Sequence, residues 1–343
     1  MAKDVLPSTA TPEAEPEKAR ERRSFWSRLP GILLRRREAS MLIVVIVLVV
    51  YFQSSNQAFF SQPNIRTISQ TVAPWAIIAA GEVMLLICGE IDLSVGNVFA
   101  LAPFIMYFTY QAGLPIWVGI ICGLLVSAVV GLFNGLVTVL LKIPSFITTL
   151  GTLFLLNGLT LVTSQGFPRL TPEVGVFNQI FGNSPYAEIL WALAIVILTQ
   201  IVLSYTRWGL HTIATGSNLL GASETGVNVN RVKIGNFMLC SVFGGFVGIL
   251  EAFRITSIDP LAGGTAVMFM AVAGAVIGGT SLMGGLGTIV GAFLGTLVLA
   301  LLQEGFTLLG VSAFTFDLIL GGAILIAMIL NVRLQLLREA GRQ

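Results

Sequence analysis

Two short segments of the chain combine carboxylate, hydroxyl and glycine residues within long apolar stretches. Residues 89–96 read Gly-Glu-Ile-Asp-Leu-Ser-Val-Gly, and residues 278–285 read Gly-Gly-Thr-Ser-Leu-Met-Gly-Gly. Both segments place Gly, Leu and Gly at the same spacing. Carboxylate oxygens accept hydrogen bonds, while hydroxyl and amide groups both donate and accept them. Groups of this kind can bind a polar molecule without reacting with it, and the candidates are Glu90, Asp92, Ser94, Asn97, Thr280 and Ser281.

The two acids of the first segment admit two interpretations. Glu90 and Asp92 are two residues apart, so their side chains point the same way in an extended segment but not in a helix. They could contact a solute directly. They could instead anchor the chain, by accepting backbone N–H groups or pairing with a cation such as Arg254. Anchoring is the favoured interpretation, and direct contact stays open.

The composition indicates which environment surrounds these segments. Hydrophobic residues make up 55% of the 343 residues, and charged residues only 10%. Soluble domains carry about 25% charged residues. From Ser40 onward the apolar runs are about 18 to 25 residues long, which matches a helix crossing a bilayer core of about 30 Å. The sequence therefore predicts an all-α polytopic membrane protein, a bundle of transmembrane helices.

We predict ten spans, with a short tail on each side of them. Residues 20–37 contain seven Arg and one acid, and such a basic stretch before the first span favours a cytoplasmic amino end. An even number of spans then places both termini in the cytoplasm. The predicted organisation is a disordered tail at 1–39, a transmembrane domain at 40–333 and a tail at 334–343. The spans are 40–58, 68–88, 95–112, 115–141, 144–165, 187–205, 234–253, 265–283, 286–309 and 313–332.

The two polar segments are predicted to break helices near the membrane midplane, in two halves related by a pseudo-repeat. Irregular backbone at that depth is tolerated only where protein or a water-filled cavity satisfies its polar groups. Matching breaks in two halves are a sequence indication of a transport path. The residues expected to cause the breaks are Gly89, Gly96, Gly278, Gly279, Gly284 and Gly285.

Glycines also recur four residues apart inside several spans, as at Gly119 and Gly123 and at Gly244 and Gly248. Small residues at this spacing let helix backbones approach closely in lipid. We expect these glycines to pack helices rather than to contact a solute.

The longest predicted inner loop, residues 206–233, contains the signals of a short helix. Asn218 can cap its start, and Gly226 can end it in a left-handed conformation. So short a helix is not stable alone in water. We therefore expect it to dock onto a partner.

Several classes of function are disfavoured by residues that the sequence lacks. It has one histidine, His211, and three scattered cysteines, so we expect no metal site. No Gly-x4-Gly-Lys-Ser/Thr segment is present, so the chain is expected to carry no ATP-binding loop, no catalytic residue and no cofactor of its own. We expect no nucleic-acid partner, because the basic tail is better explained by membrane topology.

Taken together, the segments at 89–96 and 278–285 and the loop ending Thr225-Gly226-Val227-Asn228-Val229 resemble the membrane permease of bacterial ribose-type ABC importers. That family includes the branched-chain amino acid permeases. The resemblance implies a second permease copy, cytoplasmic ATPase subunits that use the ATP, and a periplasmic sugar-binding protein. It also implies that the loop helix couples to the ATPase, through Asn218, Gly221, Ala222, Glu224 and Gly226.

The chain departs from ribose permeases in a way that leaves its cargo open. Residues 267–273 contain no carboxylate where such permeases commonly carry two, whereas Glu82 and Glu90 stand where uncharged residues are common. A pentose, a hexose or a polyol fits equally well, and so does a nucleoside, a signalling furanone or a branched-chain amino acid. An ion-gradient-driven secondary transporter is the main alternative, since the buried acids could carry protons or sodium. A membrane scaffold is disfavoured, because it gains nothing from costly breaks.

Overall fold

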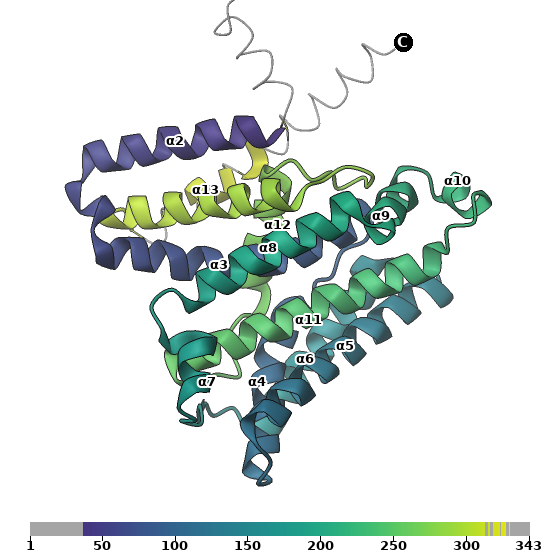
Figure 1. Ribbon diagram of the computed structural model, residues 1–343, viewed down its shortest axis with the longest axis horizontal. Coiled ribbons are helices and arrows are strands. Elements are labelled where there is room, and N and C mark those ends of the chain that lie inside the picture. The colour runs from purple at the N-terminus through teal and green to yellow at the C-terminus, as the bar shows by residue number, and fades with distance from the viewer. Residues whose placement is uncertain (1–36, 313–314, 316–317, 323, 327–328, 330–343) are drawn as a thin grey trace, which may run out of the picture.

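The computed structural model describes residues 37–312, 315, 318–322, 324–326 and 329 (Figure 1). The predicted tails at 1–39 and 334–343 lie almost entirely outside the described residues, as does much of the predicted tenth span at 313–332. Neither the division into domains nor the count of ten spans is therefore tested, and both stay predictions.

Helices dominate the part of the chain that the structure describes. The longer ones are α2 (Arg37–Ser55), α3 (Gln62–Ile87), α4 (Val95–Gln111), α5 (Ile116–Leu140), α6 (Ser145–Ser164), α8 (Ala187–Tyr205), α11 (Val229–Ile255), α12 (Gly264–Ile277) and α13 (Ile289–Leu308). The shorter ones are the 3₁₀ turn η1 (Gln57–Phe60), α7 (Val176–Asn178), the π-helical turn η2 (Gln179–Asn183), α9 (Arg207–Ser217) and α10 (Leu219–Glu224). Two short strands, β1 (Arg169–Leu170) and β2 (Ser257–Ile258), pair antiparallel.

The predicted all-α membrane bundle is confirmed. Within the described residues, seven helices are long and apolar enough to cross a membrane, namely α2, α3, α5, α6, α8, α11 and α13. The helix α8 coincides with the predicted span 187–205. The predicted span 265–283 is too long, because α12 ends at Ile277. Besides the expected short helix α10, the predicted loop 206–233 contains the helix α9, and α11 already begins at Val229.

The centre of the bundle is α3. Its residues from Val72 to Ile87 are almost all buried, and it contacts α8, α11, α12 and α13. A helix that is apolar on every side belongs in such a position. The order α2, α13 and α3 is visible at the upper left of Figure 1, and α11 lies against α5 at the lower right. By contrast, α2 is peripheral and buries little more than Phe52 against α13 and η1.

Close glycine contacts join the helices around this centre, as predicted. A Cβ atom added at Gly248 of α11 would lie 1.9 Å from the carbonyl oxygen of Phe99 in α4. A Cβ atom at Gly295 of α13 would lie 2.0 Å from the carbonyl oxygen of Gly274 in α12. Such contacts hold α4 against α11 and α12 against α13, and these helices frame the two breaks.

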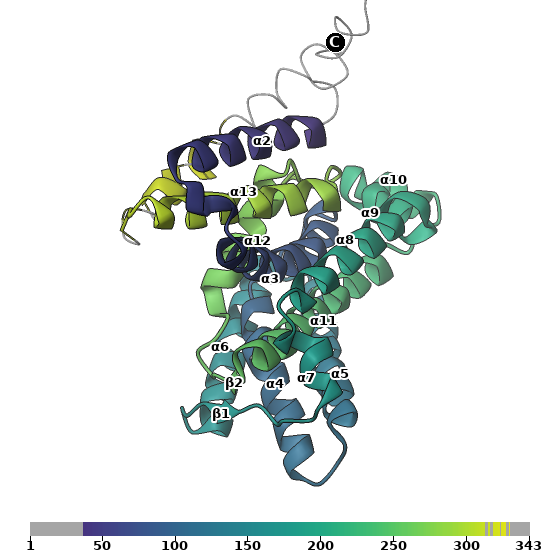
Figure 2. The same ribbon diagram turned by 60° about the vertical axis from the view of Figure 1, so that its left-hand side comes forward.

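The two ends of the bundle are built differently. The pair α9–α10 extends beyond the ends of α8 and α11 at the upper right of Figure 1. The β1–β2 ribbon lies at the opposite end, at the lower left of Figure 2. We call these the helical end and the ribbon end.

Candidate functional site

The first predicted break is an unwound segment that connects α3 to α4 inside the bundle. After Cys88, Gly89 adopts φ 76°. The amide of Gly89 donates to the carbonyl of Leu86 and that of Glu90 to the carbonyl of Leu85, at 2.9 Å and 3.0 Å. These two bonds end a helix at a left-handed glycine. Helical structure resumes at Val95, so residues 88–94 form the break.

The second break has the same local geometry. Gly279 has φ 93°, and the amides of Gly279 and Thr280 donate to the carbonyls of Val276 and Ala275. By backbone conformation Gly89 therefore corresponds to Gly279, whereas the shared spacing had paired it with Gly278. Gly278 has an ordinary helical φ and caps α12.

Two further glycines of this connection, Gly284 and Gly285, also have positive φ. Gly96 does not break a helix, contrary to our expectation, because it is the second residue of α4. This position requires glycine, because a Cβ atom there would lie 1.8 Å from the carbonyl oxygen of Gly264. The sequence pattern alone could not separate a glycine required for packing from one required for a break.

The two breaks and α9 meet at the end of α3. The amide of Gly285 donates to the carbonyl of Ile87 at 2.8 Å. A Cβ atom at Gly216, near the end of α9, would lie 1.6 Å from the same carbonyl oxygen. A shift of α9 would therefore move the end of α3 and both breaks together.

Asp92 is the centre of a buried hydrogen-bond network within the first break. Its side chain is fully buried. One carboxyl oxygen accepts the backbone N–H and the hydroxyl of Ser94, at 2.8 Å and 2.6 Å, and the amide of Asn134 at 3.4 Å. The other oxygen accepts the hydroxyl of Ser241 at 3.1 Å. The carboxyl group thus joins the start of α4 to α5 and α11.

The network continues into α6 and α3. Asn134 donates to the hydroxyl oxygen of Ser94 at 2.9 Å and accepts the hydroxyl of Thr152 in α6 at 2.7 Å. Glu82 of α3 lies on the other side of Asp92, whose backbone N–H points to it at 3.5 Å. Thr152 and Ser241 give no sequence indication of their place in this network, because single hydroxyl residues are ordinary in membrane helices. Asn134 can be recognised from the sequence as a candidate for a buried polar role, because it is an amide in a strongly apolar span.

Glu90 lies apart from this network, at the helical end. Its carboxylate forms an ion pair with Lys233, near the start of α11. Arg254, which we had considered as a partner for Glu90 or Asp92, instead pairs with Glu251 and Glu188 at the ribbon end. Glu90 and Asp92 therefore differ in role, since one is charge-paired near the end of the bundle and the other is enclosed.

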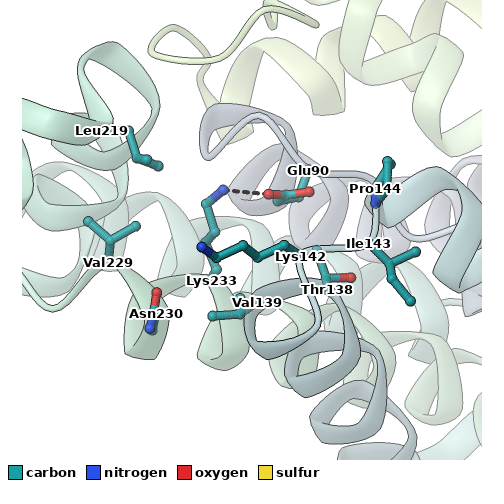
Figure 3. A pocket seen from close by; sticks show the side chains of 10 residues that line it. All are labelled: Glu90, Thr138, Val139, Lys142, Ile143, Pro144, Leu219, Val229, Asn230 and Lys233. Atoms are coloured by element: carbon teal, nitrogen blue, oxygen red, sulfur yellow. Dashed lines mark hydrogen bonds and ion pairs between the residues drawn. The ribbon is translucent and has the colours of Figure 1, made fainter.

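The ion pair lies at the edge of an open pocket of about 370 Å³. The pocket is formed by the end of α5, the α5–α6 turn, α10, the start of α11 and the first break (Figure 3). Its lining residues are Glu90, Thr138, Val139, Lys142, Ile143, Pro144, Leu219, Val229, Asn230 and Lys233. We call it the helical-end pocket.

The remaining predicted path residues are buried but not joined to Asp92. Asn97 of α4 and Thr280 of the second break each have a buried side-chain oxygen with no hydrogen-bond partner among the described residues. Ser281 accepts the backbone N–H of Met283 at 3.2 Å and shapes its own turn. The carboxylates that the structure describes form no group of three with His or Cys that could hold a metal ion.

The short helix α10 is built as its sequence predicts. The side chain of Asn218 accepts the backbone N–H of Gly221 at 2.9 Å. Gly226 has φ 86°, and the bond from Val227 N–H to the carbonyl of Ala222 closes the helix end. Ala222 is buried, whereas Glu224 is exposed. The coupling role of these residues is not tested by their geometry.

A polytopic helical bundle with two interrupted helices is the architecture of a membrane transport subunit. Residues 64–329 match the family described as the permease component of the branched-chain amino acid transport system, and the chain belongs to that family.

Similar proteins include sugar import permeases and autoinducer 2 import permeases. The xylose/arabinose import permease of Sulfolobus acidocaldarius is 44% identical over 80% of this chain and 79% of its own length. The ribose import permease of Bacillus subtilis is 35% identical over 80% and 87%. That of Escherichia coli K12 is 32% identical over 81% and 88%. No solved structure gives a significant match.

The network around Asp92 predicts a structural effect of its removal. Replacing Asp92 by Asn puts an amide among groups that already donate to it, and at least one buried donor loses its acceptor. We expect Asp92→Asn to lower the free energy of unfolding by about 1–3 kcal/mol. The measurement is thermal unfolding of the purified protein in detergent, together with solute uptake. Ser241→Ala, which removes one peripheral donor, is the matched milder variant. An unchanged melting temperature with altered uptake would assign Asp92 to the solute instead.

Proposed function

We propose that the chain is the membrane-spanning subunit of an ABC importer for a monosaccharide, with a pentose as the favoured cargo. Family membership supports the permease role, and the relative with 44% identity is named for xylose and arabinose. The structural observation that carries the proposal is the α9–α10 pair, which extends beyond the membrane-crossing helices and contacts the end of α3 (Figure 1).

The charges support an orientation with the helical end in the cytoplasm. Lys142, Arg207, Arg231 and Lys233 all lie in segments at that end. Lys and Arg are enriched in cytoplasmic loops. Because α2 starts at the same end (Figure 1), the amino terminus would lie in the cytoplasm, and ten spans would bring the carboxyl terminus back to that side of a bacterial inner membrane. The ribbon end would then face the binding protein.

The surface of α10 supports docking of an ATPase. Leu219 and Leu220 are neighbours on this helix, and Leu220 is 71% exposed. Adjacent exposed leucines outside the lipid favour burial against a partner protein. ATP would be bound and hydrolysed by that partner, and this chain would hold no cofactor.

The contacts at the helical end supply a route for coupling. Movement of α10 would act on α9, whose Gly216 lies against the end of α3 and both breaks. It would also act on the helical-end pocket, where Glu90 ties the first break to α11 through Lys233. In this mechanism the Asp92 network holds the inner end of the break while the outer end follows the ATPase.

The unpartnered buried oxygens of Asn97 and Thr280 support a role in the path. Opening the breaks would turn these groups, with Ser281, toward the hydroxyl groups of a passing sugar, while Ser94 stays bonded to Asp92. A second copy of the chain would supply the other wall of the path. A groove of about 270 Å³ between α5 and α6, lined by Thr148 and Thr152 among apolar residues, is the face that we assign to that copy.

Reconstitution tests the function directly. The chain is placed in liposomes with the ATPase and binding protein encoded beside it, and ATP hydrolysis is measured with xylose, arabinose, ribose and a polyol. We expect stimulation by a binding protein loaded with xylose or arabinose. Uptake that follows an imposed proton or sodium gradient and ignores ATP would support the secondary transporter instead.

Gly226 tests the coupling helix in the same system. A β-branched residue is strained at φ 86°, although nothing lies within 4 Å of an added Cβ atom. We expect Gly226→Val to reduce ATP-driven uptake about tenfold or more while the amount of protein in the membrane stays normal. Asn tolerates the left-handed conformation, so Gly226→Asn is the matched control and should retain most of the uptake. Normal uptake by the Val variant would count against the coupling assignment.

A further inference from the structure

The helical-end pocket, beside the ion pair that the coupling mechanism uses, also has the features of a small-molecule binding site. Its volume of about 370 Å³ lies within the range of small-molecule sites. Half of its lining is apolar, with Val139, Ile143 and Pro144 on one side and Leu219 and Val229 on the other (Figure 3). A few polar groups converge on it, which is the usual composition of a ligand pocket.

One of these polar groups is buried without a partner. Thr138 is 7% exposed, lines the pocket, and its hydroxyl has no hydrogen-bond partner among the described residues. A buried polar atom of this kind is costly unless something satisfies it. The hydroxyl group lies just inside the pocket wall, so a ligand would reach it only after a rotation of the Thr138 side chain.

The charges of the pocket favour an anion. Lys233 is paired with Glu90, so these two charges offset each other. Lys142 lines the pocket from the α5–α6 turn, and in the part of the chain that the structure describes no carboxylate pairs with it. Figure 3 shows its side chain extended across the pocket. The charge of the Lys142 ammonium group is therefore not offset within the pocket. The same pocket contains the carboxylate of Glu90, the amide of Asn230 and the unpartnered hydroxyl of Thr138.

We propose that the helical-end pocket binds a phosphorylated monosaccharide. Lys142 would pair with the phosphate, as an ammonium group does at many phosphate sites. Glu90, Asn230 and Thr138 would accept or donate hydrogen bonds to the sugar hydroxyls. The proposal rests on the proposed function in one respect, because a kinase acting on the imported sugar is the class of reaction that supplies such a ligand.

The position of the pocket gives the ligand a regulatory effect. Leu219 belongs to α10, Lys142 to the α5–α6 turn and Lys233 to α11. A molecule bound among them would tie α10 to the helices past which it must move in the ATPase cycle. The phosphorylated product would therefore slow further import.

Binding is measured on the full chain in lipid nanodiscs, by calorimetry with ribose 5-phosphate, free ribose and inorganic phosphate. We expect saturable binding of ribose 5-phosphate, and we expect it to be stronger than the binding of free ribose or of inorganic phosphate. Lys142→Gln should weaken it about tenfold, the effect of one charge-assisted hydrogen bond, and Thr138→Val should weaken it less. Arg231→Gln removes a charge from the same end without lining the pocket, and should bind normally.

Three results of the binding measurement would overturn the proposal. They are the absence of saturable binding, equal binding of inorganic phosphate alone, and binding that Lys142→Gln leaves unchanged. A loss of ATPase co-purification in Lys142→Gln would also overturn it, because Lys142 would then belong to the ATPase interface. Since binding is measured without ATPase or binding protein, its failure is distinct from a failure of the importer assignment.

With the ATPase and binding protein present, ribose 5-phosphate on the helical side should lower stimulated ATP hydrolysis in the native protein. The same concentration should have a smaller effect on Lys142→Gln. Equal inhibition of both proteins would contradict a regulatory role for this pocket.

Discussion

The arrangement of the whole molecule depends on one constraint, which is that the unwound backbone at residues 92–94 is buried inside a helix bundle. Its polar groups have no water to bond with there and must find partners in the protein. Asp92 meets this need by accepting bonds from Ser94, Asn134 and Ser241. Because those partners belong to different helices, the group that stabilises the break also fixes α4, α5 and α11 around it.

The same break joins the buried segment around Asp92 to the helical end of the bundle. Asp92 is enclosed and fully bonded, whereas Glu90, two residues earlier, pairs with Lys233 beside an open pocket. The second break and α9 reach the end of α3 through Ile87. A signal arriving at α10 therefore has short physical contacts to both interruptions, and a ligand in the helical-end pocket acts on the same junction.

Local features were predictable from the sequence, and long-range pairing was not. Apolar length located the helices, and Asn218 and Gly226 defined α10, because these signals depend only on neighbouring residues. The sequence could not pair Glu90 with Lys233 rather than Arg254, since both cations are distant along the chain and the folded bundle selects between them. Gly96 was misread because packing against Gly264 and breaking a helix require the same residue type.

In the proposed coupling route, the Glu90–Lys233 ion pair transmits movement from the helical end to the first break. Exchanging the two charges tests it most directly, with ATP-driven uptake measured for Glu90→Lys, Lys233→Glu and the double variant. Each single reversal should impair uptake, because two like charges then face each other, and the double exchange should restore most of it. Full uptake in either single variant, or no recovery in the double variant, would show that this ion pair does not transmit the movement.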